Sequence, residues 1–219
     1  MGFIAISLGE SMDEQFIHAH AQSMLQKKAS VHAAIARSSD ERGIVLLVTG
    51  PGKGKSTSAF GMLYRALGHG MRTGLVQFIT GTHTSGEITF LHQLGWMGQG
   101  APAPVDYHAM ATGCTWNSTD WSRDKQAADL AWQQALRMLG DDQLSLVVLD
   151  ELSFMLKYRY LKVEQVVAAI AARPAGMSVV ITGRDAPQEL YALADTVSEI
   201  ADVKHAFRQG VKAQPGVDY

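Results

Sequence analysis

Four continuous apolar runs divide the chain into parts the size of strands and helices. They cover residues 43–50, 74–81, 144–151 and 177–182, and each has the length of a strand buried on both faces. Residues 107–110 fit a further short strand. Strands without polar alternation are typical of parallel sheets whose two faces are covered by helices.

The segments between these strands have a helical pattern. Residues 56–67, 123–139 and 162–172 each separate two expected strands, which favours an α/β fold with a mostly parallel sheet and helices on both faces. Residues 95–105 are rich in glycine and proline, so we expect a loop there. The apolar residues expected to form the buried face of the second helix are Ala128, Leu130, Ala131, Ala135, Leu136 and Met138.

The residues before position 40 have a different character. Residues 13–38 contain no glycine or proline, and the apolar residues Ile17, Met24 and Val31 follow one another at intervals of seven. This pattern predicts a helix with a narrow apolar stripe, which needs another surface to stabilise it; a frayed leader is the alternative. We therefore expect an N-terminal leader and helix in 1–39, which docks on the core or on another subunit, and a main domain in 40–219.

Composition restricts the classes of partner. Of the 219 residues, 19 are Lys or Arg and 21 are Asp or Glu, and the net charge of −2 argues against nucleic acid or an anionic membrane as the main partner. No apolar run reaches the thickness of a bilayer, and the first residues lack the features of a signal peptide. The single cysteine, Cys114, forms no internal disulfide. We expect a cytoplasmic protein.

The segment TGPGKGKS, from Thr49 to Ser56, lies where the first strand turns into the first helix. Its alternate glycines allow backbone N–H groups to surround phosphate oxygens, Lys55 adds a positive charge, and the Ser56 hydroxyl is a ligand for Mg²⁺. The loop is one residue shorter than the common P-loop, with Thr49 at the usual glycine position. The expected nucleotide-binding residues are Gly50, Pro51, Gly52, Lys53, Gly54, Lys55 and Ser56.

A pair of carboxylates, Asp150 and Glu151, follows the third apolar run. The carboxyl end of a parallel strand faces the ligand crevice, so these side chains are candidate metal ligands together with Ser56. Two alternatives are a water-activating role for Glu151, as in ATPases, and simple capping of the next helix. The residues alone predict a P-loop protein that uses a nucleotide, without separating a kinase, an ATPase and a transferase.

Several motifs together resemble the P-loop corrinoid adenosyltransferases, a family with a P-loop NTPase-like fold. The resemblance implies transfer of the 5′-deoxyadenosyl group from ATP to the Co(I) of cobalamin or a related corrinoid, with tripolyphosphate as the leaving group. It also implies Mg²⁺ or Mn²⁺, an electron-donating flavoprotein reductase, and a homodimer in which the segment 1–39 helps to cover a partner's active site. The short P-loop belongs to the family pattern. The matching segments are 40–61, 65–70, 74–82, 110–116, 146–155, 179–184, 194–200 and 203–219.

The resemblance also assigns the remaining site residues. In MATG-x-TW, residues 110–116, the family places two aromatic residues that displace the lower axial ligand of the corrinoid. Trp116 matches one of them, and Cys114 stands at the other. With Lys55, these two are the expected catalytic residues. The basic residues in matching segments, expected near phosphate or ribose, are Arg65, Arg184, Lys204 and His205.

Two other functions remain open at this point. A P-loop ATPase or small-molecule kinase would cleave ATP at the γ-phosphate without a corrinoid. A corrinoid-binding or delivery protein would keep the fold and bind adenosylcobalamin without making it. The phosphate product distinguishes the transferase from both, because only the transferase releases tripolyphosphate.

Overall fold

The computed structural model describes residues 10–80, 84–100, 102–110 and 120–219. The chain forms two compact units, Met1–Glu41 and Arg42–Tyr219. The division falls two residues after the boundary expected from the sequence. Within the described residues, no helix combines the length and apolar character that a membrane crossing requires.

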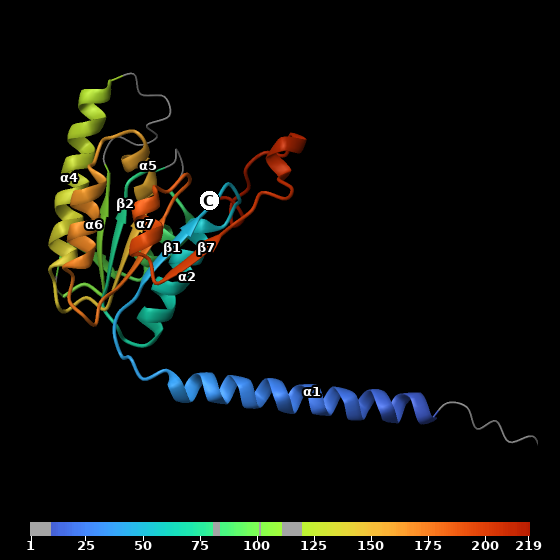
Figure 1. Cartoon of the computed structure of the whole chain (residues 1–219). Helices are drawn as coiled ribbons and strands as arrows, with labels where there is room; N and C mark the ends of the chain where they lie inside the picture. Colours follow the sequence, from blue (N-terminus) through green and yellow to red (C-terminus); the bar gives the residue numbers. More distant parts are fainter. Residues whose placement is uncertain (1–9, 81–83, 101, 111–119) are drawn as a thin grey trace, which may run out of the picture. The chain divides into compact units, whose positions relative to one another are not determined.

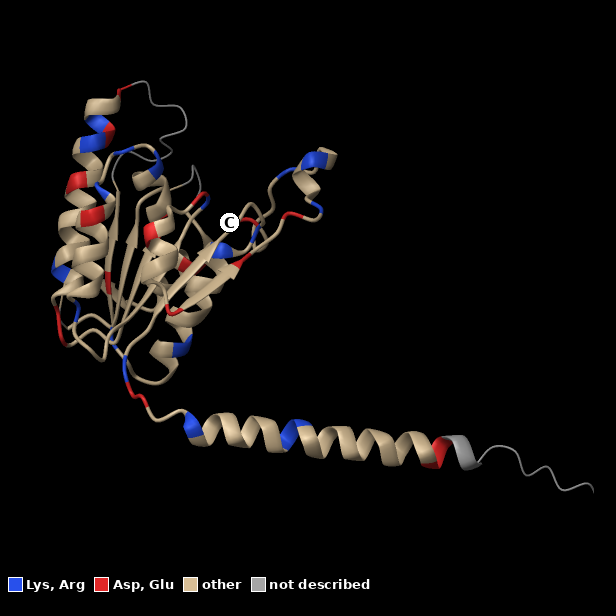
Figure 2. Cartoon of the chain, in the orientation of Figure 1, with Lys and Arg blue, Asp and Glu red and all other residues tan. Residues whose placement is uncertain are grey.

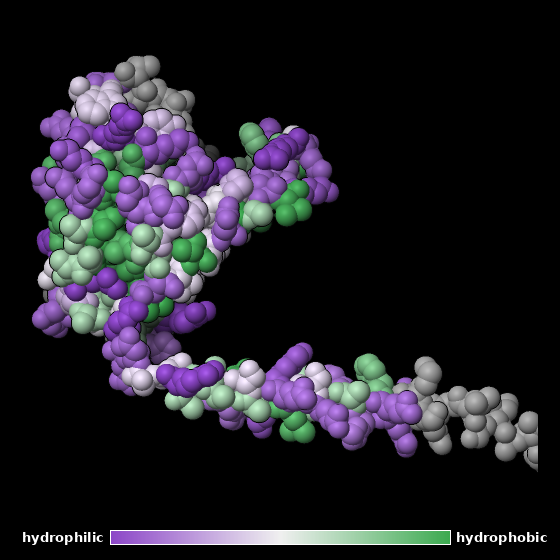
Figure 3. All heavy atoms as spheres, viewed as in Figure 1, coloured by the Kyte–Doolittle hydropathy of each residue, from purple (hydrophilic) through white to green (hydrophobic). Residues whose placement is uncertain are grey.

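The first unit contains the helix α1 (Glu10–Arg37). The three residues of the expected stripe are exposed, at 64% for Ile17, 50% for Met24 and 55% for Val31. Figure 3 shows apolar side chains between polar ones along this helix. Figure 2 shows that charged residues are few along it. The helix prediction is confirmed, and these three apolar side chains are at least half exposed.

The second unit is built on one parallel sheet (Figure 1). In the described residues the strand order is β3-β4-β2-β5-β6-β1-β7, and every neighbouring pair is parallel. The five expected strands are confirmed; they are β1 (Val45–Thr49), β2 (Thr73–Gln77), β4 (Val105–Ala109), β5 (Leu146–Asp150) and β6 (Ser178–Thr182).

Two edge strands were not expected from the sequence. The strand β3 (Met97–Gly98) lies within the segment expected to be a loop, and it has only two residues. The strand β7 (Thr196–Glu199) is exposed along its whole length and pairs with β1. Both are too short or too exposed to give the continuous apolar pattern of an inner strand.

Helices cover both faces of the sheet. Figure 1 shows α4, α6 and α7 on one face and α2 on the other, and each side has its own cluster of buried apolar residues. The expected long helices are confirmed as α2 (Lys55–Gly68), α4 (Trp121–Leu139) and α6 (Val163–Ala171). The short helices were not expected; they are α3 (Gly86–Gln93), α5 (Leu152–Lys157), α7 (Gln188–Leu193) and the 3₁₀ turn η2 (Ala206–Gln209).

The buried face of α4 differs in part from the expected one. Ala128, Ala131, Ala135 and Met138 are buried, whereas Leu130 and Leu136 were expected to be buried and are 54% and 43% exposed. The four buried residues follow one another at intervals of three and four, which keeps them on one side of a helix. The two leucines lie off that side, so their inclusion was wrong.

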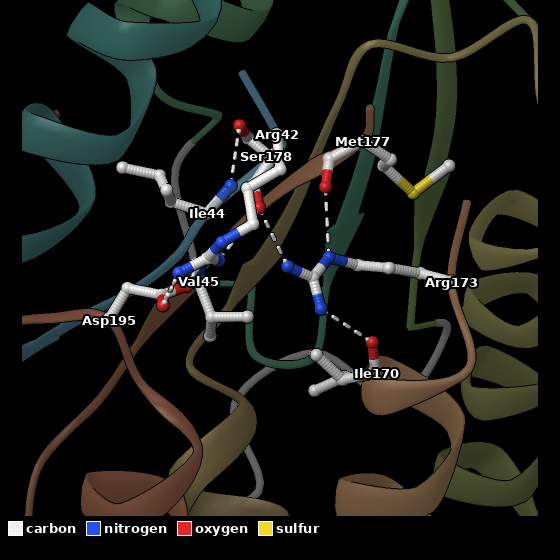
Figure 4. A network of polar contacts seen from close by, with 9 residues as sticks. Arg42, Ile44, Val45, Ile170, Arg173, Met177, Ser178 and Asp195 are labelled. Atoms are coloured by element: carbon white, nitrogen blue, oxygen red, sulfur yellow. Dashed lines mark hydrogen bonds and ion pairs between the residues drawn. The ribbon is translucent and has the colours of Figure 1, made fainter. Parts of the chain in front are cut away.

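A network of hydrogen bonds surrounds the amino-terminal end of β1 (Figure 4). The Arg42 guanidinium donates to Asp195 Oδ1 at 2.6 Å, and the Val45 N–H donates to Asp195 Oδ2 at 2.8 Å. The guanidinium of Arg173 donates to three backbone carbonyl oxygens around the same strand end. These bonds tie the start of the second unit to the loops before β6 and β7. The three acceptors are Gly43, Ile170 and Met177.

Candidate active site

A cavity of about 580 Å³ lies at the carboxyl ends of the central strands. The P-loop and the start of α2 form one wall, and polar residues from the ends of β2 and β5 form the floor. The chain after β7 supplies a further wall, through residues as distant as Tyr219. This location follows the rule that ligands bind at the carboxyl ends of the strands in open α/β sheets.

The glycines of the P-loop contribute to its structure in two ways: they adopt backbone conformations with positive φ, and they leave room for the neighbouring chain. Gly54 precedes α2 with a φ of 113°, and Gly50 has a φ of 97°, a region that other residues rarely adopt. A Cβ on Gly50 would lie 2.6 Å from the Ile200 carbonyl oxygen, and one on Gly52 would lie 2.5 Å from that of Ala201. From the sequence we predicted only phosphate binding for these glycines. In the structure, Gly50 and Gly52 also allow the chain after β7 to pack closely against the P-loop.

Lys55 lies inside the cavity and is 5% exposed. Its Nζ donates to the Gly52 carbonyl oxygen at 2.6 Å, a bond within the P-loop itself. Burial lowers the pKa of this lysine, and the nearby Arg184 lowers it further, while Glu151 acts in the opposite direction. A bound anion would oppose this lowering of the pKa, because negative charge beside an ammonium favours its protonated form.

Asp150, the last residue of β5, is held from three sides. Its Oδ1 accepts from the Thr182 hydroxyl at 2.7 Å, its Oδ2 accepts from Gln77 Nε2 at 3.4 Å, and the Ser56 hydroxyl also donates to it. Burial raises the pKa of this carboxyl above its ordinary value despite these bonds. The contacts fix the carboxylate beside the first turn of α2, at the mouth of the P-loop.

Glu151 has a left-handed backbone conformation with a φ of 57°, which is unusual for a residue with a Cβ. Its N–H donates to the Thr182 hydroxyl at 2.9 Å. Burial and the neighbouring Asp150 raise its pKa, which Lys55 and Arg184 partly oppose. Glu151 occupies the N-cap position of α5, but its side chain makes no capping hydrogen bond, so helix capping does not explain this residue.

Three residues of the site were missed by the sequence analysis. The Tyr107 hydroxyl donates to Gln77 Oε1 at 2.9 Å, so Tyr107, Gln77 and Asp150 form a chain across three strands. Thr182 completes the group from β6. Gln77 and Thr182 are the last residues of their strands. Polar residues at strand ends of a parallel sheet were the signal that could have found Gln77 and Thr182.

Most of the site residues expected from the sequence line the cavity. They are Gly52, Lys53, Gly54, Lys55, Ser56, Asp150, Glu151, Arg184 and His205. Gly50 and Pro51 belong to the loop but do not line the cavity. Arg65 is exposed in the last turn of α2, about 15 Å along the helix from Lys55, and the structure does not bring it to the site. Cys114 and Trp116 lie outside the described residues.

The sequence model of the family described as ATP:corrinoid adenosyltransferase BtuR/CobO/CobP matches residues 41–219. The chain belongs to this family. A corrinoid adenosyltransferase of Pseudomonas aeruginosa is 48% identical over 200 residues, which are 91% of this chain and 95% of that protein. Corrinoid adenosyltransferases of Escherichia coli K12 and Salmonella typhimurium LT2 are each 46% identical over 200 residues, 91% of this chain and 97% of each relative.

Membership in the ATP:corrinoid adenosyltransferase family confirms the resemblance seen in the sequence motifs. The structure brings the shortened P-loop and the strand-end carboxylates to one cavity. The family substrates are ATP and a corrinoid, and the P-loop wall of the cavity is suited to the first of these because it joins a lysine, a serine and a helix N-terminus.

The residues of this cavity fit a divalent cation bound together with phosphate. Two carboxyl groups with raised pKa values, the buried Asp150 and the half-buried Glu151, line it together with Ser56. The described residues contain no group of three or more His, Cys, Asp or Glu side chains that could hold a metal ion on their own. Mg²⁺ commonly binds through one or two carboxylates plus phosphate oxygens and water, which matches this donor set.

Proposed function

We propose that this chain transfers the 5′-deoxyadenosyl group of ATP to the Co(I) of a corrinoid and releases tripolyphosphate. The observation that carries the proposal is the short P-loop of the family, whose Lys55 and Ser56 share one cavity with the carboxylates of Asp150 and Glu151. A Co(I) corrinoid is itself a strong nucleophile toward the ribose C5′. The protein therefore needs to position the two substrates and to stabilise the leaving group.

The P-loop side of the cavity binds the triphosphate in this proposal. Lys55 and Lys53 neutralise phosphate charge, and the N-terminus of α2 adds favourable partial charge. Ser56, Asp150 and Glu151 hold Mg²⁺ or Mn²⁺, which offsets charge on the leaving polyphosphate when bound. His205 lies in the same cavity, where we expect it to contact the nucleotide.

The corrinoid side of the proposal rests on the sequence. Trp116 and Cys114 belong to the segment in which the family places the residues that displace the lower axial ligand. Trp116 would exclude that ligand by filling its space with a large apolar ring. Cys114 is smaller than an aromatic residue, so we expect it to occupy less of that space.

We also propose a cytoplasmic homodimer supplied with electrons by a flavoprotein reductase. The apolar stripe of α1 supports the dimer, because Ile17, Met24 and Val31 are at least half exposed and exposed apolar side chains in a row are typical of a surface that binds a partner.

The first test is an anaerobic assay with ATP, Mg²⁺ and chemically reduced cob(I)alamin. Formation of light-sensitive adenosylcobalamin together with tripolyphosphate is the expected result. Release of orthophosphate from ATP without corrinoid would favour an ATPase or kinase instead. Tight binding of adenosylcobalamin without turnover would favour a delivery protein.

The matched variant for this assay is Lys55→Ala. A charge-assisted bond to phosphate is worth about 1.5–3 kcal/mol, so we expect ATP affinity to fall by about 10- to 100-fold. Lys125→Ala removes a half-buried lysine of α4 that pairs with Asp129 and does not line the cavity, and it serves as the control. ATP binding by Lys55→Ala at the level of this control would contradict the proposed phosphate site.

A further inference from the structure

The chain after β7 returns to the P-loop, although the two are far apart in sequence. Lys53 Nζ and Asp218 Oδ1 lie 2.9 Å apart, and both residues line the cavity. Figure 1 shows the last residues, marked C, close to the loop between β1 and α2. Neither the resemblance nor the proposed function assigns a role to residues 213–219 of this segment.

Asp218 is held in place by a local turn. Its Oδ2 accepts from the Gln214 N–H at 2.9 Å, and its own N–H donates to the Gln214 carbonyl oxygen at 2.8 Å. The Val217 N–H donates to the same carbonyl oxygen at 3.2 Å. Ala213 and Tyr219, on either side of this turn, also line the cavity. The turn thus presents one carboxylate to the P-loop and forms part of the cavity wall.

Both lysines of the P-loop are engaged by oxygen atoms of the protein. Lys55 donates to the neutral Gly52 carbonyl, whereas Lys53 pairs with a charged group. The Lys53 ammonium holds the pKa of Asp218 below its ordinary value, so the carboxyl is ionised at neutral pH. A polyphosphate that reaches Lys53 would meet this carboxylate, and two anions a few ångströms apart repel each other.

We infer that Asp218 is an internal competitor of the polyphosphate for Lys53, and that binding of the polyphosphate releases the turn formed by residues 214–218. This inference rests on the proposed function, because it takes the P-loop to be the polyphosphate site. Asp218 thereby lowers the affinity of every ligand that extends to Lys53. After the transfer reaction it favours departure of the polyphosphate, because it recaptures the lysine.

The first test measures binding of inorganic tripolyphosphate with Mg²⁺ to the full chain by calorimetry. Because an exposed ion pair contributes little, Asp218→Asn is expected to bind about two- to five-fold more tightly than the wild type. Asp129→Asn removes the carboxylate of an exposed Lys–Asp pair in α4 and is expected to leave the affinity unchanged. In the background of Lys53→Ala, the gain from Asp218→Asn is expected to disappear.

The second readout is hydrogen exchange of the peptide that contains residues 214–219. Addition of tripolyphosphate with Mg²⁺ is expected to accelerate exchange at the Val217 and Asp218 amides, because the turn opens. Slower exchange, or equal or weaker binding by Asp218→Asn, would overturn the competitor role while leaving the phosphate site intact. Failure of the wild type to bind tripolyphosphate at all would overturn the proposed site and this inference together.

Discussion

The position of the Asp150 side chain is fixed by hydrogen bonds from residues on other elements. Thr182, Gln77 and Ser56 donate hydrogen bonds to it from β6, β2 and α2. The amide of Gln77 can donate toward Asp150 only in one of its two orientations. The Tyr107 hydroxyl selects that orientation, because it donates to the amide oxygen. Tyr107 is therefore expected to act on the metal-side carboxylate through Gln77.

Tyr107→Phe tests this role. Without the hydroxyl, the Gln77 amide can turn, and we expect the affinity for Mn²⁺ in the presence of ATP to fall several-fold. Tyr160→Phe is the matched control, since the Tyr160 hydroxyl contacts Asp124 away from the cavity. Each variant loses one hydrogen bond worth about 1 kcal/mol of stability, but only the first should alter metal binding measured by electron paramagnetic resonance. Equal metal affinity in both variants would assign Tyr107 to stability alone.

The site residues that could be predicted from the sequence are those that belong to a short local pattern. Lys55 and Ser56 follow from the loop pattern, and Asp150 follows from the end of an apolar run. Tyr107 and Asp218 could not be found in this way. Their positions depend on strand order and on the path of the chain after β7, which no local pattern encodes.

Among the elements, burial decided which could be predicted. The inner strands β5 and β6 are buried along nearly their whole length and give unmistakable apolar runs. The edge strand β7 is exposed throughout, so its sequence resembles a loop. The helices α5 and α7 have six residues each, too few to show a helical period. The missed elements are thus short or lie at an edge.

The contact between the P-loop and the chain after β7 leads to a prediction about glycine. In Gly52→Ala the new Cβ would clash with the Ala201 and Ile200 carbonyl oxygens, and overpacking costs about 1–3 kcal/mol. Gly61→Ala in α2 is the matched control, because a Cβ there meets nothing within 4 Å. It is expected to stabilise the chain by about 0.5–1 kcal/mol, since alanine favours helix. Urea unfolding measures both, and equal stability would contradict the close packing.

For the whole second unit, the Arg42–Asp195 pair predicts how stability depends on pH. The Arg42 guanidinium and the Val45 N–H lower the pKa of Asp195 from 3.8 to about 2. A carboxyl with a depressed pKa in the folded state contributes stability above its unfolded pKa. That contribution is lost as pH falls through the folded pKa.

Asp195→Asn is the variant that tests this dependence. The difference in free energy of unfolding between wild type and variant is expected to be constant above about pH 5 and to shrink between about pH 4 and pH 2. Arg42→Ala removes the main cause of the shift and should show the same narrowing against the wild type. A difference that stays constant down to about pH 2 would mean that the pair does not hold the carboxylate.

The position of β1 in the sheet has a consequence for synthesis of the chain. Its neighbours are β6 and β7, and the contacts around its start join residues 134 and 150 positions apart. A ribosome therefore makes the phosphate loop before β2, β4 and β5, whereas both neighbours of β1 emerge after them. Pairing across such separations closes large loops and folds slowly. The nucleotide site is thus expected to assemble only after β6 and β7 have been synthesised.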